Sequence, residues 1–148
     1  LPPPEPLHPP TLPAPLRWLG ATLEHLMCRP AAPFMTVSSG LAFAPLRSPP
    51  PYHASKAAMH MLSESIRLQL AGTSVQVMEL EPPAVATDLM PGHADSPGSM
   101  PLAEFIDEVM GLIESAPEAT EIQVERVKFL RYGEARGDYP QVVAALNA

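Results

Sequence analysis

The fold is decided by residues 34–80, which read FMTVSSGLAFAPLRSPPPYHASKAAMHMLSESIRLQLAGTSVQVMEL. Residues Phe34–Ser38 are typical of a short buried strand, and apolar residues recur at helical spacing through Tyr52–Ala71. Gly72 then stands where a left-handed helix cap is expected, and residues 74–80 alternate as a strand does. The stretch therefore predicts a strand–helix–strand unit.

The same alternation extends to both sides of this unit. A short helix is predicted at residues 17–29 and another at 101–115, and Ile122 with Val124 indicates a last short strand. Strands that alternate with helices of this length imply right-handed crossovers and a parallel sheet. We expect an α/β fold, a partial Rossmann-like parallel sheet with flanking helices, in residues 17–148. The segment from Glu125 onward is ambiguous.

Residues 1–16 differ from the rest in composition. Eight of the 21 prolines of the chain lie there, and each removes a backbone donor and fixes φ. We expect a proline-rich, disordered arm without helix or central strand. Two interpretations stay open: a ligand for a proline-recognising domain such as SH3, or an inert tail, which includes the product of an altered reading frame.

Composition and charge narrow the partners and the compartment. The chain has 148 residues and a net charge of −7, which allows one domain with a core and argues against a nucleic-acid partner. No apolar run is long enough to cross a membrane, and prolines interrupt the N-terminus before a signal peptide can develop. Cys28 is the only cysteine, so an internal disulfide and a cysteine zinc cluster are excluded. A cytoplasmic setting is expected, and no metal ligand is predicted.

Tyr52 and Lys56 lie four residues apart at the start of the predicted long helix, hence one turn apart on one face. The pKa of a tyrosine is ordinarily about 10, and a nearby ammonium lowers it by favouring the phenolate. Such a tyrosine can act as general acid or base on a carbonyl/alcohol pair. Ser39 ends the preceding strand, thirteen residues before Tyr52, where its hydroxyl can hydrogen-bond a substrate oxygen.

Each of these residues has a plainer explanation when it is taken alone. Ser39 can be a turn residue, Tyr52 a packed aromatic and Lys56 a solvated charge, but these explanations do not account for all three at this spacing. His53 and His60 are interpreted as surface residues of the helix, because no carboxylate is paired with them nearby in the sequence.

With VSSG at residues 37–40 and YHASK at residues 52–56, the chain resembles the active-site segment of the short-chain dehydrogenases/reductases. Their pattern is a serine at a strand end, followed by Tyr-x-x-x-Lys at the start of a long helix. EPPAVATD at residues 81–88 is similar to the Pro-Gly-x-x-x-Thr loop of the family, with Pro83 in place of the usual glycine. The resemblance covers residues 21–148, and its later part is most similar to bacterial oxidoreductases of unassigned substrate.

The resemblance implies an oxidoreductase that uses NAD or NADP and interconverts a small-molecule carbonyl and alcohol by hydride transfer. It implies Tyr52 as the proton donor or acceptor, Lys56 as the group that lowers the pKa of Tyr52 and binds the nicotinamide ribose, and Ser39 as the residue that positions the substrate carbonyl. Thr87 would hydrogen-bond the nicotinamide carboxamide. The cofactor-binding residues that the resemblance implies are Tyr52, Lys56, Pro82, Val85 and Thr87.

The glycine-rich turn that seats the cofactor pyrophosphate in this family is absent from the sequence, as are the Asn-Asn-Ala-Gly segment and the catalytic asparagine. The chain thus resembles a truncated, C-terminal half of the family, in which strands that should be central become edges. Two hypotheses follow: an oxidoreductase that is incomplete as this chain, or a non-catalytic fragment that acts only in dimerisation or is a degenerate remnant. The Tyr–Lys helix commonly packs against its symmetry mate in the family, so the resemblance implies a homodimer through residues 52–71.

Overall fold

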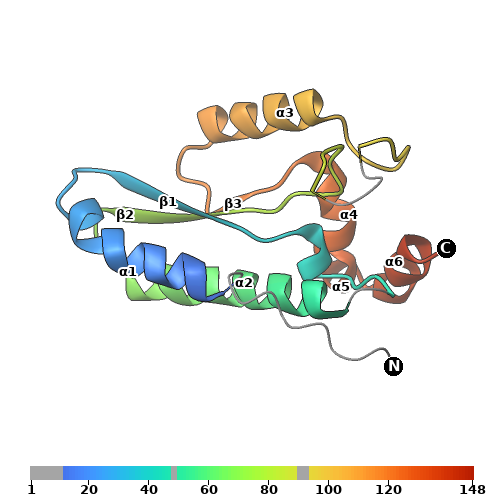
Figure 1. Cartoon of the computed structure of the whole chain (residues 1–148), viewed down its shortest axis with the longest axis horizontal. Helices are drawn as coiled ribbons and strands as arrows, with labels where there is room; N and C mark the ends of the chain where they lie inside the picture. Colours follow the sequence, from blue (N-terminus) through green and yellow to red (C-terminus); the bar gives the residue numbers. More distant parts are fainter. Residues whose placement is uncertain (1–11, 48–49, 90–93) are drawn as a thin grey trace.

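The computed structural model describes residues 12–47, 50–89 and 94–148 (Figure 1). The strands form one parallel sheet in the order β1-β2-β3. The predicted α/β fold with a parallel sheet and flanking helices is therefore confirmed. The elements in chain order are α1 (Pro13–Met27), β1 (Ala32–Val37), the 3-10 turn η1 (Gly40–Ala42), α2 (Pro50–Gln69), β2 (Val75–Leu80), α3 (Leu102–Ser115), β3 (Glu121–Ile122), the 3-10 turn η2 (Glu125–Val127), α4 (Lys128–Arg131), α5 (Gly133–Arg136) and α6 (Tyr139–Leu146).

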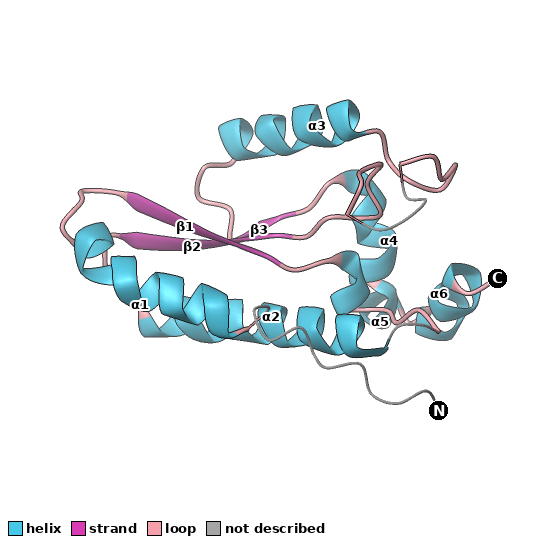
Figure 2. Ribbon diagram, viewed as in Figure 1, coloured by secondary structure: helices cyan, strands magenta, loops and turns pink. Residues whose placement is uncertain are grey.

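The helices cover both faces of the sheet. Figure 2 shows α1 and α2 on one face and α3 on the other. Successive side chains of a strand point to opposite faces, and β2 follows this rule: Val77 packs with Leu19 and Ile66, whereas Met78 packs with Val109 and Ile122. Three consecutive residues of β2, Val77, Met78 and Glu79, are buried, as is usual for the central strand of a parallel sheet.

α1 begins four residues before the predicted start of the helix at residue 17, so the prediction of a helix-free arm is wrong for residues 13–16. Pro13 is the first residue of the helix and Pro15 lies in its first turn. The N–H groups of a first turn have no partner within the helix, so prolines are tolerated there. Residues 1–11 of the predicted arm lie outside the described residues.

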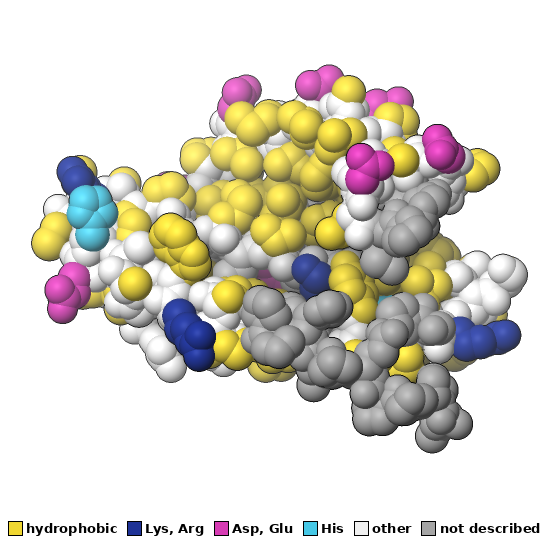
Figure 3. All heavy atoms as spheres, in the orientation of Figure 1, with side chains coloured by type: hydrophobic (Ala, Val, Ile, Leu, Met, Phe, Trp, Pro, Cys, Tyr) yellow, Lys and Arg dark blue, Asp and Glu magenta, His cyan; other side chains and the backbone are white. Residues whose placement is uncertain are grey.

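β1 is an edge of the sheet within the described part of the chain, because it pairs with β2 only. Its side chains Met35 and Val37 remain 39% and 46% exposed. Hydrophobic side chains gather on this face between α3 and α1 (Figure 3). The expected exposed edge is confirmed, and it is lined by apolar surface.

The segment after β3, which gives no clear pattern in the sequence, folds as η2, α4, α5 and α6. Val127 and Val142 are fully buried within it. It packs on the loop after β1, where the side chain of Asn147 accepts from Arg47 N at 2.6 Å and donates to Pro45 O at 3.1 Å. Helices of four to eight residues are too short for their periodicity to be read. Within the described ranges, every helix is too short or too polar to cross a membrane.

Candidate active site

Tyr52 and Lys56 lie in the first two turns of α2, which begins at Pro50 rather than at Tyr52. Lys56 Nζ lies 5.7 Å from the centre of the Tyr52 ring and donates a hydrogen bond to Val37 O at 3.1 Å. The lysine is therefore held between the tyrosine and the last residue of β1. Burial lowers the pKa of Lys56. The structure thus brings together two of the predicted site residues at the carboxyl end of a strand.

Ser39 follows the same end of β1. The strand stops at Val37, so Ser39 lies two residues beyond it and is not its last residue as predicted. It is the N-cap of η1, and its Oγ accepts a hydrogen bond from Leu41 N at 3.2 Å. The hydroxyl hydrogen of Ser39 is not used in that bond. Ser39 is buried, so its position is fixed by the packing around the loop.

Pro82 is joined to the Ser39 loop by the backbone. Gly40 N donates to Pro82 O at 2.9 Å, and Ser38 N donates to Leu80 O at 3.0 Å. The loops after β1 and β2 are therefore hydrogen-bonded side by side. A side chain at Gly40 would meet Val127 and Leu130 at 2.7 and 2.9 Å, so this close packing of the loop on the C-terminal segment depends on glycine.

Val85 and Thr87 lie in the loop that follows Pro82. Val85 forms an isolated parallel bridge with Met100, in which Ala86 N donates to Met100 O at 2.8 Å. Thr87 is half-buried, and its Oγ1 accepts from Leu89 N at 3.5 Å. These contacts order the loop near its two ends, while residues 90–93 between them lie outside the described residues.

A groove of about 490 Å³ opens beside Lys56, between α1 and the exposed edge of the sheet. Its walls are mostly apolar and include Trp18 of α1 with Phe34 and Val37 of β1. Lys56 also lines the groove, and its ammonium keeps donors beyond the one given to Val37 O. The free donors of Lys56 match the ribose hydroxyls of a nicotinamide nucleotide, which accept hydrogen bonds, and the groove walls can contact the face of a flat ring.

The pyrophosphate of such a cofactor is not matched by these residues. A tight phosphate-binding turn lies between a strand and the helix that follows it and uses glycines that adopt positive φ. Within residues 12–47, 50–89 and 94–148, the residues with positive φ are Gly72, which precedes β2, and Gly137, which lies between α5 and α6. The described residues therefore fit the nicotinamide end of the cofactor and not its phosphates.

The interpretation of His53 and His60 as surface residues is wrong. His53 is buried, its ring lies 5.9 Å from that of Tyr52, and burial lowers the pKa of its imidazole. His60 Nδ1 donates to Glu79 at 3.0 Å, and Glu79 lies on β2, nineteen residues away in the sequence. The sequence does not reveal this partner because the pairing depends on how α2 packs on the sheet.

Two comparisons by sequence place the chain among known proteins. The model of the short chain dehydrogenase family matches residues 12–96, more than half of the chain. Uncharacterized oxidoreductase DltE of Bacillus subtilis is 38% identical over 139 residues, which cover 90% of this chain and 54% of DltE. Uncharacterized oxidoreductase SERP2049 of Staphylococcus epidermidis is 32% identical over 77 residues, which cover 52% of this chain and 34% of that protein.

Solved structures share the fold. A short chain dehydrogenase from Burkholderia cenocepacia, in complex with NADP, superposes with a TM-score of 0.76 at 22% identity over 94% of this chain and 58% of that one. A short-chain dehydrogenase from Sphingobium yanoikuyae, in complex with NADPH, gives 0.68 at 19% identity over 90% of this chain and 53% of that one. The chain spans about half the length of DltE and of these structures. By its sequence match and its fold, the chain belongs to the short chain dehydrogenase family.

Proposed function

We propose that this chain supplies the catalytic residues of an NAD- or NADP-dependent oxidoreductase that interconverts a small-molecule carbonyl and an alcohol. The observation that carries the proposal is the position of Lys56, whose ammonium lies between the Tyr52 ring and Val37 O. The lysine thereby places a donor and a positive charge beside the Tyr52 ring, and a tyrosine hydroxyl can pass a proton to or from a substrate oxygen.

The proposed roles follow from the contacts of each residue. Tyr52 donates its hydroxyl proton to the carbonyl oxygen during reduction and takes a proton back during oxidation. Ser39 Oγ accepts from Leu41 N, so its hydrogen is free to donate to the same substrate oxygen. When bound, the nicotinamide supplies or accepts the hydride. Lys56 keeps donors that can reach the ribose hydroxyls.

The remaining cofactor contacts are assigned to the loop after β2. Pro82 O is occupied by Gly40 N, which fixes Pro82 beside the Ser39 loop. Thr87 presents a hydroxyl for the carboxamide, and Val85 is held by its bridge to Met100. The two structural neighbours bind NADP and NADPH, which supports a nicotinamide nucleotide as the cofactor here. A reducing compartment such as the cytoplasm is part of the proposal, because Cys28 is a free, exposed thiol.

The central test is steady-state kinetics of Tyr52→Phe with one accepted carbonyl substrate. It is made on the full-length protein, meaning the complete oxidoreductase to which this chain is proposed to supply the catalytic residues. The substitution keeps the ring and deletes the proton-transferring hydroxyl, so kcat should fall at least about a hundredfold. Tyr139→Phe is the matched control, because it deletes a tyrosine hydroxyl at the start of α6. Full activity in Tyr52→Phe, or an equal loss in both variants, would show that the assignment is wrong.

The second candidate is a non-catalytic fragment, and the described residues give it one supporting observation, the unmatched pyrophosphate. Residues 1–148 alone should then bind NADH or NADPH only weakly, with a Kd above about 1 mM. Titration calorimetry measures this directly. Micromolar binding would show that another segment of this chain seats the phosphates, and it would remove the support for this candidate.

We also propose that the protein forms a homodimer through α2. Its outer face carries the small exposed residues Ala54 and Ala57 together with Met61 and Leu68, which are 63% and 78% exposed. Small residues allow close helix approach, and exposed apolar side chains on one face indicate an interaction surface. Ala57→Arg should convert a dimer to a monomer in light scattering, whereas Ala103→Arg on α3 should not; a dimer that survives Ala57→Arg contradicts the proposed interface.

A further inference from the structure

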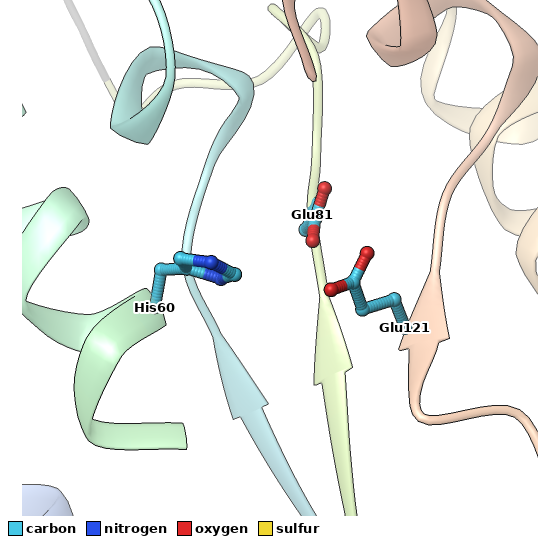
Figure 4. Close-up of side chains that lie close together, drawn as sticks. All are labelled: His60, Glu81 and Glu121. Carbon is cyan, nitrogen blue, oxygen red and sulfur yellow. The ribbon is translucent and has the colours of Figure 1, made fainter. Parts of the chain in front are cut away.

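A second group of titratable side chains lies where α2 packs on β2, beside the start of β3. His60 of α2 and Glu121 of β3 point toward Glu81, which directly follows β2 (Figure 4). Glu79 lies two residues earlier on the same strand and holds His60. We call these four residues the Glu cluster. None of them belongs to the active site proposed above.

The Glu cluster contains more negative than positive charge. The side chains of Glu79 and Glu81 are 0% exposed. Arg131 supplies one guanidinium, whose nitrogens lie 3.6 Å from Glu81 Oε2 and 3.1 Å from Glu121 Oε1. Arg131 and a protonated His60 together would still leave one of the three carboxylates unbalanced, and buried charge without compensation is costly. The cluster therefore requires further positive charge, from protons or from a cation.

One carboxylate oxygen in the cluster has no partner. Gln123 donates to Glu81 Oε2 at 3.1 Å and also to Glu121, while Tyr132 holds the Gln123 carbonyl at 2.7 Å. Among the described residues, Glu81 Oε1 is buried without any hydrogen bond. A buried acceptor without a donor marks the point where an additional ligand would be bound.

His60 is held by Glu79 through one ring nitrogen. Its Nδ1 lies 3.1 and 3.0 Å from the two oxygens of Glu79. When Nδ1 carries the proton shared with this carboxylate, Nε2 keeps its lone pair. Metal-bound histidines commonly have such a carboxylate on the other nitrogen, which fixes the ring and raises its basicity.

We propose that His60, Glu81 and Glu121 bind a divalent cation that accepts mixed nitrogen and carboxylate ligands, with Zn²⁺ as the best match. One donor atom from each residue lies within 4.8 Å of the others. Zinc bonds of about 2.1 Å place tetrahedral donors about 3.4 Å apart, so the three groups must draw together on binding. His60 and Glu121 can do so because their side chains are 18% and 20% exposed, which also gives the ion a path inward.

The ion would supply the positive charge that the cluster lacks. It would also tie α2, β2 and β3 together directly before Pro82, at the start of the loop proposed to contact the cofactor. The site therefore has a structural role in this chain, and it can be tested without any enzyme assay.

The test is Zn²⁺ titration of chelator-stripped residues 1–148 by calorimetry, together with thermal unfolding with and without Zn²⁺. The parent chain should bind one equivalent and unfold at a higher temperature in its presence. Glu81→Gln keeps the side-chain volume and should weaken binding at least tenfold and abolish the thermal shift. Glu118→Gln, which changes an exposed glutamate before β3, should behave as the parent.

Folding of each variant is checked by far-UV circular dichroism, and Glu81→Gln should fold because the amide keeps the volume and polarity of the buried side chain. Glu121→Gln provides a second variant that should also lose Zn²⁺. The proposal is overturned if the folded parent shows no one-to-one binding at roughly 1 mM Zn²⁺. It is equally overturned if both ligand variants bind as the parent does, since the ion would then lie elsewhere, or if Zn²⁺ leaves the thermal unfolding of the parent unchanged.

Discussion

α2 carries two polar regions that lie on neighbouring turns and have opposite surroundings. Tyr52 and Lys56 occupy the first two turns and face the end of β1, the open edge of the sheet in the described chain. His60 lies one turn later and faces Glu79 on β2, which has a strand on each side. The first region is half-buried beside a groove, whereas Glu79 and Glu81 are fully buried.

The difference shows how the position of a strand decides what a polar group can do. At the edge, an ammonium can remain close to water and reach a ligand, so its chemistry depends on what else lines the groove. In the interior, each charge must be matched by residues of this chain or by a bound ion. Substitutions in the first region should therefore change activity, and substitutions in the second should change the stability of the chain itself.

The largest effect is expected for Lys56→Met in the full-length protein. It removes the charge beside the Tyr52 ring and a donor for the ribose, so kcat should fall at least about a hundredfold and the KM for the cofactor should rise. Steady-state kinetics with varied cofactor measure both. Lys128→Met is the matched control, because Lys128 is paired with Glu125 at the surface at 2.6 Å and should stay within about twofold of the parent. A loss in kcat without a change in cofactor KM would contradict the ribose contact.

The next effect concerns the Glu cluster in the interior. The quantity measured is the free energy of unfolding of the metal-free chain, with a chelator present. The folded-state pKa of Glu81 is raised from 4.5 to about 8, so the native chain holds a proton that the unfolded chain releases. Its stabilising contribution is complete below pH 4.5 and is lost as the pH rises through 8. The free energy of unfolding should fall across this window by up to about 1.4 kcal/mol per pH unit.

Glu81→Gln should flatten this decline, because the amide does not titrate. Urea unfolding at several pH values measures the slope for the parent, Glu81→Gln and Glu118→Gln. A parent chain whose stability rises between pH 5 and 8, or a slope that Glu81→Gln leaves unchanged, would mean that the proton is held elsewhere.

The fold and the first region could be predicted largely from local sequence. Hydrophobic periodicity indicates the order of strands and helices. Gly72 has the expected left-handed conformation, but it lies in the turn between α2, which ends at Gln69, and β2. The spacing of Tyr52 and Lys56 within one helix fixes their proximity without knowledge of packing. The placement of Ser39 needed only the rule that ligands bind beyond the carboxyl ends of parallel strands.

The Glu cluster could not be predicted in this way. Its members lie on α2, on β2 and directly after it, and on β3, and 61 positions of the chain separate His60 from Glu121. The sequence does contain one signal: Glu79 interrupts a strand, VQVMEL, whose central position in a parallel sheet requires apolar residues. A charge in such a strand indicates a buried partner, but it does not identify that partner.

A smaller effect is expected for Ser39→Ala in the full-length protein. The substitution deletes the donor to the substrate oxygen, so kcat should fall roughly tenfold while cofactor affinity is spared. It also deletes the cap of η1, which costs about 1 kcal/mol of stability. Ser65→Ala is the control, because Ser65 is exposed on α2 and bonds only to Met61 O in the preceding turn. Weakened cofactor binding in Ser39→Ala would place the serine in a role other than the one proposed.

The smallest effect is expected at His53, and it has the opposite pH dependence to that of Glu81. Burial lowers the pKa of His53 below its ordinary value of 6.5, and Nε2 has no partner among the described residues. The unfolded chain therefore binds the proton more readily. The contribution of His53 to stability is fully present above pH 6.5 and is lost as the pH falls through the lowered folded-state value. His53→Leu keeps a similar volume and removes the titrating ring, so it should reduce the acid-side loss of stability. The alkaline-side decline caused by Glu81 should remain unchanged, because the two residues lie in different regions.

Urea unfolding of His53→Leu, Glu81→Gln and the double variant between pH 4 and pH 9 measures both sides. If His53→Leu altered the alkaline side, or if the two substitutions were not additive, the two regions of α2 would be energetically coupled rather than separate.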